Sequence, residues 1–311
     1  MSFVTKVIHR GLTTSALRMA AIKNVTVIGG GQMGAGIAQV AAQTGHHVTV
    51  VDQSEEILAH SRLTIERSLA RVAKKKFGED AKAAETFTKN AMSLIDVNTD
   101  ALAAVAKTDL VIEAIVENVK VKQELFSQLD KVAPAETIFA SNTSSIPISD
   151  IASGTDRRDR FGGIHFFNPV PVMKLVEVVR TPEQSEATIK TLTEFVVKLG
   201  KVPVACKDTP GFIVNRLLVP YMMESIRLLE RGDASARDID TAMKLGAGYP
   251  MGPFELADYV GLDVTKFIID GWHEKYPDNP IFEPSPLLDK KVADGKLGTK
   301  TGEGFYTYGK K

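Results

Sequence analysis

The sequence predicts an α/β protein in which a Rossmann-like doubly wound sheet with a helical-hairpin insertion precedes an all-α domain. A strand, a glycine-rich turn, a helix and a second strand follow one another from residue 23, which is the order of a βαβ unit. Apolar strands and helical patterns keep alternating up to residue 207, and helical patterns follow it. The chain, at 311 residues, also has the length of about two domains.

The bulk composition excludes several classes of protein. Lys and Arg number 38 and balance 38 Asp and Glu, so there is no overall attraction to nucleic acid. We find no apolar stretch of about 18 residues, and therefore expect no membrane span. Cys206 is the single cysteine, which rules out an intrachain disulfide and a multi-cysteine metal site. No other metal-ligand spacing is present.

Residues 1–22 differ from the rest of the chain. The charged residues up to Lys23 are all basic, and the first acidic residue is Asp52. Hydroxyl side chains lie between the basic ones, which is typical of a mitochondrial transit peptide. A disordered cytosolic tail is the alternative. We exclude this segment from the predicted fold.

Residues 23–207 are predicted to form the first domain. Apolar runs predict strands at residues 23–28, 47–52, 109–115, 137–140, 161–166 and 172–179. A helix of small residues follows the glycine turn through Ala42, and an amphipathic helix covers residues 119–132 and stops before Pro134. Residues 54–92 are helical in pattern but broken at Gly78-Glu79-Asp80. This insertion is expected to be a helical hairpin at the edge of the sheet.

Residues 208–311 are predicted to form the helical domain. Thr209-Pro210 has the signature of a helix N-cap and first turn. Gly232 is expected to end this helix and Pro220 to kink it. Further helices are expected at residues 238–245, 253–260 and 263–272.

The first glycine-rich turn carries the fingerprint of a Rossmann-like dinucleotide site. Gly29, Gly31 and Gly34 separate a strand from a helix, and Asp52 ends the next strand about 20 residues later. Glycines let the backbone approach a pyrophosphate at the helix N-terminus. Asp52 would accept hydrogen bonds from ribose hydroxyls and repel a 2′-phosphate, which favours NAD over NADP. A tight turn beside a solvated acid is the alternative. The predicted contact residues are Gly29, Gly30, Gly31, Gln32, Met33 and Gly34.

His165 is the best candidate for a catalytic base among the six histidines. It lies near the end of an apolar run, where a strand delivers side chains to a cleft, although a satisfied core histidine would look the same. Glu177 favours catalysis, because a carboxylate within an apolar strand needs a partner. If the two strands pair, Glu177 can hold one imidazole nitrogen while the other faces a substrate hydroxyl.

Three weaker signals remain open at this point. The loop 142–145 follows a strand at the ligand-binding edge of the sheet, but Ser144 or Ser145 could instead cap a helix. Asn215, early in the second domain, could be merely exposed. Ser68, Arg71 and Lys75 share a helix face beside the run Lys74-Lys75-Lys76, which suits the phosphates of coenzyme A or is simply a solvated face.

Together these motifs resemble one family, the short-chain L-3-hydroxyacyl-CoA dehydrogenases of the mitochondrial matrix. The resemblance runs from about Lys23 to the carboxyl end. The motifs that carry it are Val27-Ile28-Gly29-Gly30-Gly31, Ala140-Ser141-Asn142-Thr143-Ser144-Ser145, His165-Phe166-Phe167-Asn168-Pro169 and Asp208-Thr209-Pro210-Gly211-Phe212.

The resemblance implies an enzyme of fatty-acid β-oxidation that transfers hydride from C3 of a 3-hydroxyacyl-CoA to NAD. It implies that His165 is the base and that Glu177 orients it. Ser144 and Asn215 would contact the reacting oxygen. Family positions for NAD fall on Asp52, Glu117, Lys122, Ser144, Asn168 and Lys300, and those for the acyl-CoA on Ser68, Lys75 and Ser144. A homodimer built through the helical domain, with a cleft that closes over the substrate, is also implied.

Two rival functions remain. A dehydrogenase of hydroxy acids without CoA would keep the glycines, Asp52 and His165 but lack the basic hairpin. A non-catalytic NAD-binding protein would have no need for the pair of His165 and Glu177.

Overall fold

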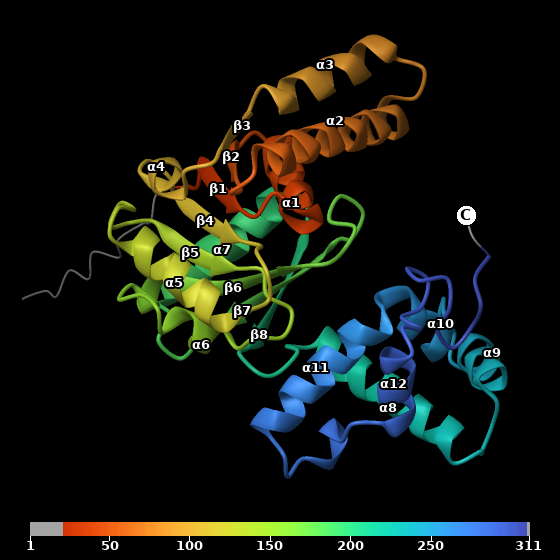
Figure 1. The fold of residues 1–311 in the computed structure, drawn as a ribbon. Coiled ribbons are helices and arrows are strands. Elements are labelled where there is room, and N and C mark those ends of the chain that lie inside the picture. The colour runs from red at the N-terminus through yellow and green to blue at the C-terminus, as the bar shows by residue number, and fades with distance from the viewer. Residues whose placement is uncertain (1–20, 310–311) are drawn as a thin grey trace, which may run out of the picture.

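The computed structural model describes residues 21–309, which form a sheet domain and a helical domain (Figure 1). The predicted transit peptide lies outside the described residues except for its last two. The predicted α/β class with a doubly wound sheet and an all-α second part is confirmed.

Eight strands form one sheet in the order β3-β2-β1-β4-β5-β6-β7-β8. Their bounds are Asn24–Ile28 (β1), His47–Val51 (β2), Ile95–Asn98 (β3), Leu110–Glu113 (β4), Ile138–Ser141 (β5), Phe161–Phe166 (β6), Leu175–Arg180 (β7) and Val202–Lys207 (β8). Neighbouring strands are parallel except for β6 and β7, which are antiparallel. The chain winds outward in both directions from β1, and the carboxyl ends of the first six strands share one edge.

Helices cover both faces of the sheet. Their bounds are Gln32–Ala42 (α1), Glu55–Phe77 (α2), Ala81–Met92 (α3), Ala101–Val105 (α4), Val119–Asp130 (α5), Ile148–Ala152 (α6) and Glu186–Lys198 (α7). One core lies between the sheet and helices α1 and α7, and the other lies between the sheet and α4, α5 and α6. Strands buried on both faces explain the continuous apolar runs seen in the sequence.

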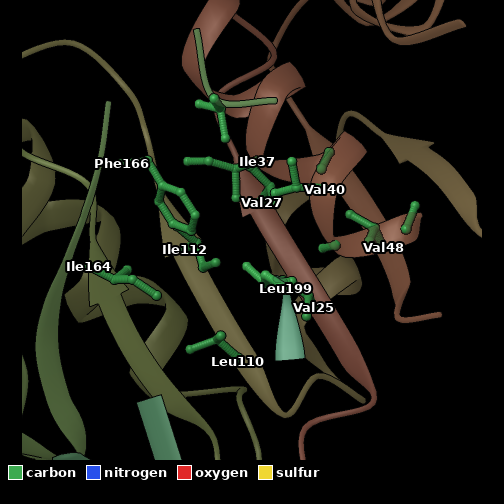
Figure 2. Close-up of a cluster of buried hydrophobic side chains, with 14 of the residues drawn as sticks. Val25, Val27, Ile37, Val40, Val48, Leu110, Ile112, Ile164, Phe166 and Leu199 are labelled. Carbon is green, nitrogen blue, oxygen red and sulfur yellow. The ribbon is translucent and has the colours of Figure 1, made fainter. Parts of the chain in front are cut away.

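Figure 2 shows the core on the α1 side. Val25 and Val27 of β1 meet Ile37 of α1, while Leu110 and Ile112 of β4 point to the same face. Side chains one residue apart in a strand point to opposite faces, and Val111 accordingly belongs to the other core. The central strands are therefore held from both sides, which gives the carboxyl edge of the sheet a rigid base.

The predicted helical hairpin is present as α2 and α3 and projects from the body of the sheet domain (Figure 1). Helix α2 begins after Ser54, whose hydroxyl accepts a hydrogen bond from the Ile57 amide at 3.3 Å. Gly78, with φ of 58°, ends it. The rings of Phe77 and Phe87 lie 5.7 Å apart and join the two helices near the turn.

The helical domain contains five α-helices among the described residues. Their bounds are Val214–Glu230 (α8), Ala236–Gly246 (α9), Pro253–Val260 (α10), Leu262–Lys275 (α11) and Pro286–Ala293 (α12). They pack around one apolar core that includes Met223, Phe254 and Ile269. Gly232 has φ of 74° just beyond the end of α8, as expected for a helix terminator.

The predicted helix start at Thr209-Pro210 is wrong. Helix α8 begins at Val214, and its N-cap residue Ile213 makes no side-chain capping bond. Gly211 and Phe212 have φ values of 76° and 53°, and a right-handed helix cannot include this left-handed turn. The sequence signature marks the turn between the domains rather than the helix itself.

The predicted strand 172–179 also needs correction, because β7 begins only at Leu175. The amides of Val172 and Met173 both donate to the Pro169 carbonyl and form a turn instead. Strands β3 and β8 and helices α4, α6, α7 and α12 were not predicted. The edge strand β8 is partly exposed along its length, so it lacks the apolar run of a central strand.

Within residues 21–309, no helix is long and apolar enough to cross a membrane. The same residues contain no group of three or more His, Cys, Asp or Glu side chains placed to hold a metal ion.

Candidate active site

The Gly29–Gly34 turn has the geometry of a dinucleotide site. Gly29 has φ of 110°, and a Cβ there would lie 2.4 Å from the Ala114 carbonyl oxygen. A Cβ on Gly34 would lie 1.8 Å from the Gly29 oxygen, so both positions exclude larger residues. A Cβ on Gly31 would meet no other atom within 4 Å. The N-terminus of α1, which follows Gly31, has no side-chain cap. A phosphate fits this open helix end, so the residues present suit NAD.

Asp52 follows β2 and contacts the same turn. Its Oδ2 accepts a hydrogen bond from the Gly30 amide at 2.8 Å. The carboxylate is only partly buried, and it remains open to the hydroxyls of a ribose. Gln32 is exposed and Met33 is half-buried at the start of α1.

His165 and Glu177 form the buried centre of the site. They face each other across the antiparallel pair β6 and β7, and His165 Nδ1 lies 2.8 Å from Glu177 Oε2. Burial alone would raise the pKa of Glu177, but hydrogen bonds from His165 and the Val214 amide outweigh it and lower that pKa below its ordinary value. An ionised carboxylate can only accept, so His165 Nδ1 donates to it, and Nε2 faces away from Glu177.

Ser144 and Asn215 complete this group. Ser144 Oγ lies 3.0 Å from His165 Nε2, which is the nitrogen that a substrate hydroxyl would need. Asn215 Nδ2 donates to the Ser144 carbonyl oxygen at 3.2 Å. Neither Ser144 nor Ser145 caps helix α6, because Asp208 accepts the first amides of that helix.

A second buried network supports the Ser144 loop. Lys122 is 1% exposed and lies between two carboxylates, 2.6 Å from Glu113 and 3.1 Å from Glu117. Glu117 in turn accepts hydrogen bonds from the Thr143 hydroxyl and the Ser144 amide. Burial alone would raise the pKa of Glu117, but the Lys122 charge and the Thr143 hydroxyl outweigh it and lower that pKa. Glu117 and Lys122, both predicted to bind NAD, are thus connected through hydrogen bonds to the loop that carries Ser144.

Asn168 and Lys300 lie apart from this buried group. Asn168 is exposed in the loop after β6, and the Lys201 ammonium holds that loop through the carbonyls of Val170 and Met173. Lys300 belongs to the helical domain and pairs with Asp263 at 2.6 Å.

Two of the three predicted CoA residues, Ser68 and Lys75, lie on helix α2 of the hairpin, whereas the third, Ser144, lies beside His165. Ser68 is half-buried on α2, whereas Arg71 and Lys75 are exposed. Within the basic run, Lys76 lies over the rings of Phe77 and Phe87, 5.3 and 5.1 Å from their centroids. Lys75 therefore points to solvent with its charge available.

Three supporting residues escaped the sequence analysis: Glu113, Lys201 and Asp208. Glu113 sits in an apolar strand, as Glu177 does, and the same argument about an unpaired buried carboxylate would have singled it out. Lys201 and Asp208 had no such signal, because their partners lie more than 25 residues away. Cys206 is half-buried, and burial with the charges of Glu177 and Asp208 raises its pKa to about 12, which does not suit a nucleophile.

Comparison with known proteins decides the family. The model of the 3-hydroxyacyl-CoA dehydrogenase NAD-binding domain matches residues 24–209, and the model of the C-terminal domain of the same family matches residues 211–308. The chain belongs to the 3-hydroxyacyl-CoA dehydrogenase family. The resemblance noted in the sequence is thereby confirmed, and so are an NAD-dependent oxidoreductase and NAD as its cofactor.

Individual relatives support the same family assignment. The chain is 64% identical to the human mitochondrial hydroxyacyl-coenzyme A dehydrogenase over 99% of this chain and 100% of that protein. It is 45% identical to the 3-hydroxybutyryl-CoA dehydrogenase of Mycobacterium tuberculosis, over 93% and 99% of the two chains. The crystal structure of (S)-3-hydroxybutyryl-CoA dehydrogenase from Ralstonia eutropha matches with a TM-score of 0.88 and 40% identity, covering 93% of this chain and 100% of that one.

Proposed function

We propose that this enzyme oxidises the 3-hydroxyl of an (S)-3-hydroxyacyl-CoA to a ketone with His165 as the base. The observation that carries this proposal is the buried contact of His165 with Glu177, which leaves Nε2 beside Ser144. A neutral imidazole with one nitrogen fixed by a carboxylate suits proton removal from a hydroxyl.

The chain's own groups divide the work as follows. His165 Nε2 takes the hydroxyl proton, and the Glu177 charge stabilises the imidazolium that results. Ser144 Oγ, 3.0 Å from that nitrogen, and the nearby Asn215 amide hold the substrate oxygen in line. NAD, when bound at the Gly29–Gly34 turn, supplies the hydride acceptor.

The hairpin face is proposed to hold the CoA part of the substrate. Ser68 and Lys75 lie seven residues apart on α2, which is two helical turns and brings both to one face. Lys75 and Arg71 present positive charge there. Glu117, Lys122, Asn168 and Lys300 are proposed as NAD contacts on the resemblance alone.

An absorbance assay tests the function. NADH is incubated with the purified protein and acetoacetyl-CoA, and then with acetoacetate. We expect loss of NADH absorbance with the thioester only. Equal loss with acetoacetate would point to a hydroxy-acid dehydrogenase, and no loss with either would point to a non-catalytic NAD-binding protein.

We further propose a homodimer built through the helical domain. Large apolar side chains stand exposed on this domain, which supports a buried interface there. They include Leu217, Leu245, Tyr249, Tyr259, Val264 and Phe267. Light scattering should give twice the chain mass, and Phe267→Glu should shift the mass toward that of one chain.

The proposed location is the mitochondrial matrix. The acid-free, hydroxyl-rich residues 1–22 support import, and four relatives at 63% or 64% identity are named mitochondrial. Mass measurement of the protein from mitochondria should show a shortened amino terminus. We also keep the domain division at residue 207 as a proposal, supported by the end of β8 there.

A further inference from the structure

The loop between β6 and β7, residues 167–174, extends from the proposed base to the helix that follows the glycine turn. At its start, the ring centroids of Phe167 and His165 lie 4.5 Å apart. Further along, Val170 is 2% exposed and packs against α1, where a Cβ on Gly36 would lie 2.8 Å from the Val170 Cβ. NAD bound at the glycine turn must reach the substrate beside His165, and the 167–174 loop touches both ends of that path.

A buried ammonium group holds this loop. Lys201 is 9% exposed, and its Nζ donates hydrogen bonds to the carbonyl oxygens of Val170 and Met173, the second at 2.6 Å. The amide of Val202 donates to the Lys174 carbonyl at 2.8 Å. Burial lowers the pKa of Lys201, and no carboxylate in the described part of the chain counteracts it. The charge of Lys201 is therefore directed at the loop carbonyls.

The end of α7 places Lys201 at this position. Gly200, with φ of 72°, follows the helix. The amides of Gly200 and Lys201 donate to the carbonyls of Val197 and Val196 at 2.9 and 3.2 Å, which is the pattern of a Schellman motif. Lys201 thus extends from a well-defined helix end beside the start of β7, where the loop joins the sheet.

We propose that Lys201 is a positioning residue for the cofactor. Its ammonium holds the 167–174 loop against α1, so that Asn168 on this loop, proposed as an NAD contact, stays fixed relative to the pyrophosphate site. A hydrogen bond from a charged donor is stronger than one between neutral groups, which suits a loop held by one side chain. The catalytic meaning of this inference rests on the proposed function, whereas cofactor binding and exchange in the loop are measured without substrate.

Fluorescence titration with NADH tests the link to the cofactor. Lys201→Met keeps the apolar stem but removes the ammonium. If the released loop holds its binding position only about a tenth of the time, the NADH dissociation constant rises about tenfold. KM for NADH should rise with it, while kcat at saturating NADH stays within about twofold, because the change removes binding and not chemistry. A lower melting temperature with an unchanged NADH dissociation constant would overturn the proposal.

Amide hydrogen exchange without ligand tests the hold on the loop itself. The amides of Val172 and Met173 donate to the Pro169 carbonyl within the loop, and both should exchange faster in Lys201→Met. Saturating NADH should slow them again, since the bound cofactor holds the loop. Unchanged exchange in Lys201→Met would contradict the proposal. Absence of NADH oxidation by the wild type with acetoacetyl-CoA would refute the proposed function but leave the titration and exchange results standing.

Two matched variants separate the contact from the charge. Lys198→Met removes an exposed lysine three residues earlier and should leave the NADH dissociation constant and the exchange in the loop near wild type. Lys201→Arg keeps a charged donor and should retain most of the affinity that Lys201→Met loses. Equal losses in Lys198→Met and Lys201→Met would mean that positive charge in this region matters and the loop contact does not.

Gly36→Ala tests the same loop from the α1 side with Lys201 intact, and it serves even where Lys201→Met does not fold. The added Cβ displaces Val170, so the NADH dissociation constant should rise here too. The two changes combined should cost less than the sum of their separate effects, because both release one loop. Gly271→Ala in α11, where a Cβ meets no atom within 4 Å, is the control and should change nothing. Normal NADH affinity in Gly36→Ala, or additive losses in the double variant, would overturn the proposal.

Discussion

The proposed catalytic junction and the proposed CoA-binding face of the hairpin differ in how completely the folded protein arranges their side chains. At the junction, His165, Glu177, Ser144 and Asn215 already contact one another across β6, β7 and α8. On the hairpin, Lys75 is exposed and Ser68 half-buried, and neither contacts the junction among the described residues. The proposed proton-transfer groups are therefore arranged in advance, whereas the proposed CoA site would be completed by the ligand.

This difference has an energetic reason. A buried carboxylate or imidazole must have its partners in the folded state, because desolvation without them is costly. The ammonium group of an exposed lysine stays hydrated until a phosphate replaces the water. Substitutions at the junction should therefore affect turnover or stability, and substitutions on the hairpin should affect substrate binding alone.

The largest effect is expected for His165→Gln. Loss of a general acid-base group costs on the order of 10²–10⁴-fold in turnover, and the NADH dissociation constant should stay near wild type because the Gly29–Gly34 turn is unchanged. Steady-state kinetics measures the turnover, and fluorescence titration measures the NADH dissociation constant. Near-normal turnover of a less heat-stable enzyme would show that His165 is a core residue.

The second-largest effect is expected for Lys122→Met, which should lower the free energy of unfolding. It leaves Glu113 and Glu117 without their shared ammonium, and breaking a buried pair costs about 3–5 kcal/mol. Lys266 is a matched control, because it also lies between two carboxylates, Asp270 and Asp289, but is more exposed. Lys266→Met should cost under about 1 kcal/mol. Denaturant unfolding would compare them, and equal losses would contradict the role of burial.

Asp52 should give a smaller but clear preference for NADH over NADPH. Repulsion between its carboxylate and a 2′-phosphate should lower kcat/KM for NADPH on the order of 10²-fold, since like charges brought together cost several kcal/mol. Steady-state kinetics with both cofactors measures the ratio. Similar efficiencies would show that Asp52 only holds the Gly30 amide.

The smallest effect is expected on the hairpin. Lys75→Glu should raise KM for acetoacetyl-CoA about tenfold, which corresponds to roughly 1.4 kcal/mol, and leave KM for NADH and the melting temperature near wild type. Lys89→Glu on α3, also exposed, is the control and should change neither KM. A rise in both KM values would remove the hairpin from the CoA site.

The same contrast explains what the sequence could predict. The glycine turn, Asp52 and the pair of His165 and Glu177 were accessible, because strand periodicity and buried charge are local signals. The register that sets His165 opposite Glu177 came only with the structure. So did the capping of α8 by Glu177, since Thr209-Pro210 imitates a helix start while the true cap comes from a strand 36 residues earlier.

The most direct test of the account is the pH dependence of acetoacetyl-CoA reduction by the wild type and Glu177→Gln. Reduction needs a protonated His165, so kcat/KM should fall as pH rises. The pKa of Glu177 lies below its ordinary value, so its charge is present throughout the neutral range and favours the imidazolium. Without that charge, the fall should begin at lower pH in Glu177→Gln. The same midpoint in both enzymes would contradict an acid-base pair of His165 and Glu177.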